Sequence, residues 1–198
     1  MISVKKYPPA FVTPNDVFAF LGVHKADAKK QLENEICSVI SELLGIVSPR
    51  LCYSIYPLSI NSSTVDLGFT SVQSADLAKC LLGCTDVIAV CATVGLDTDR
   101  LIAKYSRLSP SRALILQAAG AASVEALLDT FENELKEDGY MLRPRFSCGY
   151  GDLPLTLQKN IFAALDCQKN IGVSLTDSML MTPTKSVSAL IGVEKRYI

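Results

Sequence analysis

The spacing of apolar and polar positions predicts two principal amphipathic helices. Between residues 26 and 45, apolar residues recur every three or four positions beside a charged face. A longer helix is predicted from Pro110, behind a capping Ser109, to about Asp138. Its middle, residues 117 to 123, is a run of small residues against which another element can pack closely.

Shorter helices are predicted on both sides of these two. The first begins at Thr13-Pro14-Asn15-Asp16, with proline in the first turn, and ends near Gly22. The others are expected over residues 74 to 82, 96 to 105 and 155 to 165.

Four segments have the composition of strands. Residues 51 to 60 and 64 to 70 are rich in β-branched and aromatic residues and predict a hairpin around Asn61-Ser62-Ser63. Residues 86 to 94 form a continuous apolar run, which is typical of a strand buried on both faces. A last strand is predicted over residues 186 to 193. The pattern favours one α+β domain over residues 1 to 198, with a mixed, mostly antiparallel sheet flanked by the helices near 26 to 45 and 110 to 138.

Composition and charge exclude several classes of protein. The 198 residues are 49% hydrophobic and 20% charged, which excludes a disordered chain. A formal net charge of -1 gives no long-range attraction to nucleic acid. The longest apolar runs are far shorter than the roughly 20 residues of a membrane span. Lys5 and Lys6 lead into prolines and not into the apolar run of a signal peptide. We therefore expect a cytoplasmic protein that binds neither nucleic acid nor membrane.

The cysteines and the histidine give no evidence of a metal site. Seven cysteines, an odd number, argue against a disulfide framework and favour core thiols. Cys80, Cys84 and Cys91 lack a C-x-x-C pair and a fourth nearby ligand, so core packing is favoured over a zinc or iron-sulfur site. His24 is the single histidine and has no neighbours with the spacing of a triad or a zinc site.

The segment from residue 143 to residue 193 carries the candidate chemistry. Arg145 offers a planar fork of donors suited to a carboxylate. Gly149 and Gly151 allow a ligand to approach bare backbone, and Tyr150 between them offers a ring face with a polar tip. Together these residues predict one wall of a pocket.

A second part of the same site is expected about thirty residues further on. The motif Met181-x-Pro183-x-x-Ser186-Val187-Ser188 indicates a proline-kinked loop that enters a small-residue strand, because proline is tolerated only at the start or edge of a strand.

Several spaced motifs, in this order, resemble those of the activation domain of cobalamin-dependent methionine synthase. That domain binds S-adenosylmethionine and remethylates the cobalamin when its cobalt has been oxidised. The resemblance is good over residues 143 to 193 and poor elsewhere. Its motifs are Arg145-x-x-x-Gly149-Tyr150, Lys169-x-Ile171-Gly172, Leu175-Thr176-x-Ser178, and Met181-x-Pro183-x-x-Ser186-Val187-Ser188.

The resemblance implies a set of ligand-binding residues and no catalytic residue. It places a glutamate of the long helix at the amino group of the ligand; Glu125 fits best, and Glu132 is the competing candidate. Several alternatives stay open: an ordinary surface ion pair for Arg145, a core ring for Tyr150, a packed thiol for Cys148, a plain tight turn at Gly149 and Gly151, and a solvated side chain for Glu125. The family's acidic contact near the N-terminus has no clear match, because the chain has no Trp and Asp16-Val17-Phe18 is only a faint echo. The implied ligand-binding residues are Glu125, Arg145, Ser147, Cys148, Gly149 and Tyr150, and the pocket-lining candidates are Gly151, Met181, Pro183 and Ser186.

The resemblance also implies a function that needs partners. In that mechanism cob(II)alamin takes one electron from a flavodoxin-like or ferredoxin-like donor, and the reduced cobalt attacks the sulfonium methyl. The chain is too short to hold the folate, homocysteine and cobalamin modules, so a cobalamin-binding methionine synthase module or a corrinoid protein would act in trans. We therefore expect a stand-alone component of a methyltransferase in methionine biosynthesis. The alternative is a non-catalytic ligand-binding or assembly protein that keeps the fold; a small-molecule methyltransferase is disfavoured because no glycine-rich first strand-turn-helix is present.

Overall fold

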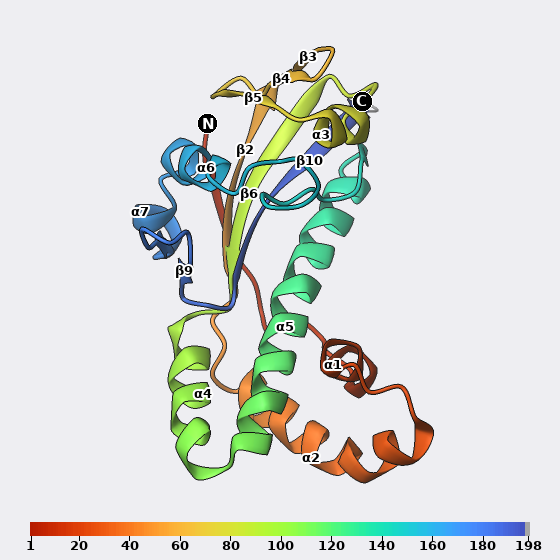
Figure 1. Cartoon of the computed structure of the whole chain (residues 1–198), viewed down its shortest axis with the longest axis vertical. Helices are drawn as coiled ribbons and strands as arrows, with labels where there is room; N and C mark the ends of the chain where they lie inside the picture. Colours follow the sequence, from red (N-terminus) through yellow and green to blue (C-terminus); the bar gives the residue numbers. More distant parts are fainter. Residues whose placement is uncertain (197–198) are drawn as a thin grey trace.

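A curled antiparallel sheet and one long helix form the frame of the computed structural model, which describes residues 1–196 (Figure 1). The helix runs along one face of the sheet and continues below it. All of its strand pairings are antiparallel, as predicted for most of the sheet. The strands, in order across the sheet, are β1 (Ser3–Lys6), β2 (Arg50–Pro57), β6 (Asp86–Thr93), β10 (Ser186–Arg196) and β7 (Tyr140–Leu142).

The central strand β6 is apolar along its length because both of its faces are covered. Successive side chains of a strand point to opposite faces. One face of β6 presents Val87, Ala89 and Cys91, and the other presents Ile88, Val90 and Ala92, all of them buried. The predicted strand buried on both faces is therefore confirmed.

The predicted helices are all present. The first begins with a capping box between Thr13 and Asp16 and ends at Gly22 in the left-handed conformation, at the start and stop that the sequence predicts. The helices are α1 (Pro14–Leu21), α2 (Ala26–Leu44), α3 (Ala75–Cys80), α4 (Leu96–Leu108), α5 (Pro110–Glu137), α6 (Leu157–Leu165) and the unpredicted α7 (Cys167–Ile171).

The long helix α5 joins two parts of the molecule. Its second half covers one face of the sheet, where Leu127, Leu128 and Phe131 are fully buried. Its first half packs below the sheet against α1, α2 and α4 (Figure 1). By length and composition α5 alone among the helices of residues 1–196 could cross a membrane, yet 61% of its most apolar stretch is buried within this fold.

The expectation that α2 flanks the sheet is wrong. Its apolar stripe packs against α1 and α5 in the helical part of the molecule (Figure 1). The physical reason is that α5 already covers this face of the sheet, which leaves the α2 stripe to be buried by other helices. The stripe consists of Ile36, Val39, Ile40 and Leu43.

The opposite face of the sheet is covered by α3, α6, α7 and short strands. The predicted strand over residues 51 to 60 in fact divides, because β2 ends at Pro57 opposite Asp86, the first residue of β6. The chain then leaves the main sheet, and residues 59 to 61 form the predicted hairpin with residues 64 to 66 in a separate small sheet. The short strands are β3 (Ser59–Asn61), β4 (Thr64–Asp66), β5 (Ser71–Gln73), β8 (Ser174–Leu175) and β9 (Met181–Thr182).

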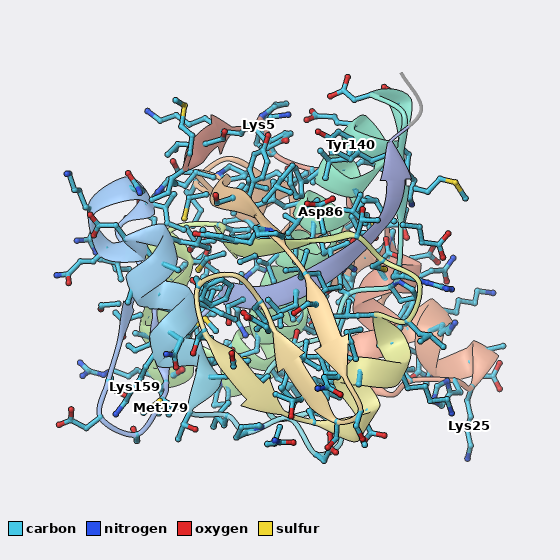
Figure 2. The ribbon with its side chains drawn as sticks, turned by 90° about the horizontal axis from the view of Figure 1, so that it is seen from above. Lys5, Lys25, Asp86, Tyr140, Lys159 and Met179 are labelled. Carbon is cyan, nitrogen blue, oxygen red and sulfur yellow. The ribbon has the colours of Figure 1, made fainter. Side chains whose placement is uncertain are left out.

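The view from above shows the curl of the sheet. The blue ribbon of β10 curves between the light-blue helices on one side and the teal end of α5 on the other (Figure 2). Lys25, the residue just before α2, projects far from the sheet (Figure 2). A side chain from a segment next to β10 can therefore point either toward α5 or toward the layer of α6 and α7.

Candidate functional site

Arg145 points toward α5 because of its register against β10. The chain that follows β7 continues along β10, where the N–H of Arg143 donates to the carbonyl of Gly192 at 2.9 Å. Phe146 and Leu190 exchange two backbone hydrogen bonds of 2.9 Å each. Phe146 packs into the core on the α6 side. Since neighbouring side chains of an extended chain point to opposite faces, Arg145 enters the α5 side.

Three carboxylates of α5 meet Arg145 there. Residues four and seven positions apart share a face of a helix, so Glu125, Asp129 and Glu132 lie in one row. The guanidinium Nη2 lies 3.0 Å from Glu125 Oε2 and 2.8 Å from Asp129 Oδ1. Its Nη1 donates to Glu132 Oε1 at 2.7 Å. One guanidinium thus contacts three carboxylates that lie in a row along α5.

The carboxylates of the cluster stabilise the charge of Arg145, whose side chain is only 22% exposed. Burial acts to lower the Arg145 pKa, but Asp129 and Glu132 together outweigh it, so the pKa lies above its ordinary value. One cation and three anions give the cluster a formal charge of about -2 at neutral pH. The surroundings of Arg145 therefore attract a further cation.

A cavity of about 360 Å³ opens beside this cluster. Its volume lies within the range of small-molecule sites, which begins at roughly 300 Å³. It brings together residues from α5, from the segment after β7 and from β10. They are Glu125, Arg145, Phe146, Ser147, Tyr150 and Val187.

A second hollow of about 370 Å³ lies on the other side of Glu125, between α1 and α5. It contains three carboxylates, from Asp16, Glu125 and Asp129, and the exposed ring of Phe11. The carboxylate of Asp16 already accepts hydrogen bonds from the backbone N–H of Thr13 at 2.8 Å and from the Thr13 hydroxyl at 2.7 Å. Asp16, the weak match to the family's acidic contact near the N-terminus, therefore serves first as part of a helix cap. Glu125 lines both hollows and is the residue that connects them.

The loop that carries Tyr150 is tied to α3 by two carboxylates. Asp152 accepts hydrogen bonds from the Ser74 hydroxyl and from the N–H groups of Ala75 (2.7 Å) and Asp76 (3.2 Å). Asp76 in turn accepts from the Asp152 N–H at 3.2 Å. Gly151 has a φ of +53°, and a Cβ there would collide with the Asp76 carboxylate, so only glycine fits. This anchored loop leaves Tyr150 71% exposed.

Acid should loosen this anchor. The hydrogen bond from Ser74, with further bonds from backbone N–H groups, holds the pKa of Asp152 below its ordinary 3.8. A carboxylate with a pKa lowered by folding stabilises above its unfolded pKa, and that contribution is lost as the pH falls through the folded pKa. We expect NMR amide shifts of Ala75 and Asp76 to change in that acid range. In Asp152→Asn they should lack this step; an identical course in both proteins would contradict the anchor.

The structure places the other predicted residues in several environments. Ser147 lines the cavity, and Gly149, with a φ of +90°, forms the turn before Tyr150. Cys148 is buried in the core on the α6 side, and burial raises the pKa of its thiol to about 11, as in the packed-thiol alternative. All seven cysteines are free thiols, and within residues 1–196 no three His, Cys, Asp or Glu side chains could hold a metal ion.

The Met181 to Ser186 segment lies at the lower edge of the sheet. Met181 packs against the core, and Pro183 is buried. The Ser186 hydroxyl lies 2.7 Å from the carbonyl oxygen of Pro183 and 2.9 Å from the Thr93 hydroxyl. Among the described residues that line the Arg145 cavity, this motif is represented by Val187.

Sequence reasoning overlooked Asp129. Its signal was present, because Glu125, Asp129 and Glu132 have the spacing of one helix face. The sequence presents Glu125 and Glu132 as competing candidates, whereas the structure places both on the same guanidinium.

Two comparisons with known proteins found matches. The family model described as vitamin B12 dependent methionine synthase, activation domain, matches residues 75–197, a range that includes Glu125, Arg145 and Tyr150. A solved structure described as the MetH reactivation domain bound to AdoHcy has a similar fold, with a TM-score of 0.70. The match covers 100% of this chain and 80% of that chain at 14% identity. No curated protein matches by sequence.

Proposed function

Because the chain belongs to the activation-domain family of vitamin B12-dependent methionine synthase, we propose that it binds S-adenosylmethionine and supports reductive methylation of cob(II)alamin on another polypeptide. The observation that carries this proposal is the cavity in which Arg145 and Glu125 stand side by side. A guanidinium and a carboxylate are the partners that an amino acid's own carboxylate and ammonium require.

The residues present fit the charged groups of S-adenosylmethionine. The ligand has one carboxylate and two cationic groups, the ammonium and the sulfonium, so its net charge is positive. Arg145 is the cation for the carboxylate, and the excess negative charge around it favours the two cationic groups. Tyr150 offers an aromatic surface in the same cavity for the adenine ring.

The chain would act by binding and orientation. When bound, S-adenosylmethionine supplies an electrophilic methyl. A flavodoxin-like or ferredoxin-like donor would supply the one electron that the partner's cob(II)alamin needs in order to accept this methyl. The electrons of the broken carbon-sulfur bond would stay on the sulfur of S-adenosylhomocysteine. No proton moves, so the role of Arg145, Glu125 and Tyr150 is to hold the methyl in line with its acceptor. Such orientation can lower the barrier to reaction by about 7 kcal/mol or more.

One observation favours the second candidate, a ligand-binding or assembly protein without this activity. Three carboxylates of the chain itself already neutralise Arg145. A protein that had lost its ligand would have the same arrangement, with Arg145 serving only to fix α5 against the segment beside β10.

A methylation assay separates the two candidates. With a cobalamin-bearing partner, a low-potential electron donor and S-adenosylmethionine, the protein should accelerate formation of methylcobalamin, followed by optical spectra, and should need all three. Tyr150→Ala should slow the reaction roughly two- to tenfold, because a ring contact is worth about 0.5 to 1.5 kcal/mol. Binding of S-adenosylmethionine by calorimetry without any rate above the protein-free reaction would favour the second candidate.

A further inference from the structure

The edges of the Arg145 guanidinium limit how a ligand carboxylate can pair with it. A guanidinium binds a carboxylate through two parallel bonds, either at its end, from Nη1 and Nη2, or at its side, from Nε and Nη2. Both edges use Nη2. In this structure Nη2 donates to Glu125 at 3.0 Å and lies 2.8 Å from a carboxylate oxygen of Asp129, so these two acids occupy the space around Nη2. A ligand carboxylate can therefore form two bonds only if one of these acids leaves.

The exposure of the three acids identifies which one leaves most readily. Glu132 is 13% exposed and bonds to Nη1, so it is fixed in the protein interior. Glu125 is 40% exposed and lines both hollows. Asp129 is 64% exposed, so water can replace Arg145 around its carboxylate at little cost. Asp129 lines the second hollow but not the Arg145 cavity, which leaves it room on the side away from the ligand.

We propose that Asp129 competes with the ligand's carboxylate for Arg145 and so tunes the affinity for carboxylate-bearing ligands. This inference rests on the proposed binding of S-adenosylmethionine. One carboxylate replaces another in the exchange, so Arg145 keeps three anionic partners and Glu125 and Glu132 stay in place. Asp129 thus acts through Arg145 as a specificity-determining residue. In the protein without ligand, the three acids of α5 hold the Arg145 side chain in position.

The test compares two ligands in two proteins. S-adenosylmethionine and its decarboxylated form share the ammonium, the sulfonium and the adenosyl group, and only the first has a carboxylate. Asp129→Asn removes one negative charge, which acts on the cationic groups of both ligands alike. The ratio of their association constants, measured by calorimetry at fixed ionic strength, therefore reports the effect of Asp129 on the ligand's carboxylate. We expect Asp129→Asn to raise this ratio about two- to fivefold in favour of S-adenosylmethionine, the range for an exposed ion pair.

Glu137→Gln is the matched control. Glu137 is an exposed residue in the last turn of α5, and its replacement changes the net charge by the same amount. It should leave the ratio unchanged. An unchanged or lower ratio in Asp129→Asn overturns the inference alone, and equal weakening of both ligands assigns Asp129 to their cationic groups instead. Absence of S-adenosylmethionine binding to the wild-type protein overturns the proposed function and this inference together.

Discussion

Replacing Phe131 with alanine should lower the free energy of unfolding by about 3 to 5 kcal/mol, the usual cost of deleting a buried aromatic ring. Phe131 is completely buried where α5 packs on the sheet. Its ring centroid lies 4.8 Å from that of Tyr53, in a tilted arrangement. The cavity left by alanine would lie between α5 and the sheet, where the surrounding strands can collapse only partly. Urea unfolding followed by circular dichroism measures the change.

Phe11→Ala is the control for this prediction. It deletes the same ring, but Phe11 is 84% exposed, so the expected change is within about 0.5 kcal/mol. Equal effects of the two substitutions would show that the contact between α5 and the sheet contributes no more than surface packing.

Replacing Arg145 with alanine should weaken S-adenosylmethionine binding by about 1.5 to 3 kcal/mol, the range for hydrogen bonds to a charged group. The substitution removes the cation for the ligand's carboxylate and leaves three anions of α5 without a counter-charge. Arg145→Lys should recover only part of the affinity, because a point charge cannot reproduce a planar fork. Titration calorimetry gives both values.

The same substitution should also destabilise the fold, since Glu132 would be left 13% exposed and without its partner. Adding Glu132→Gln to Arg145→Ala should restore part of the stability, because an amide needs no counter-charge, while binding stays weak. If the alanine variant binds with unchanged affinity, Arg145 is a structural ion pair and belongs to the second candidate function.

The elements predicted well were those with local signals. The capping box of α1, the start of α5 at Pro110 and the run of β6 depend on residues close together in sequence. The segments β1, β7 and α7 went unpredicted, because short elements have no periodicity of their own and form only against a partner. β1, for example, is defined by its pairing with β2.

For the site, the sequence by itself determined the conformation of the glycine loop that carries Tyr150. Only glycine suits the positive φ values at positions 149 and 151, so the turn that exposes Tyr150 follows from residue type. The sequence also placed three acids on one face of α5 and an arginine two residues before Ser147.

Only the tertiary structure decided that these groups meet. Arg145 reaches α5, and Phe146 reaches the opposite core, because the segment after β7 pairs with β10 in one register; a shift by a single residue would exchange the two faces. That register is set by contacts between residues far apart in the chain, such as Phe146 with Leu190. The burial of Glu132, the exposure of Asp129 and the cavity beside them follow from the same packing, and no local pattern of residues encodes them.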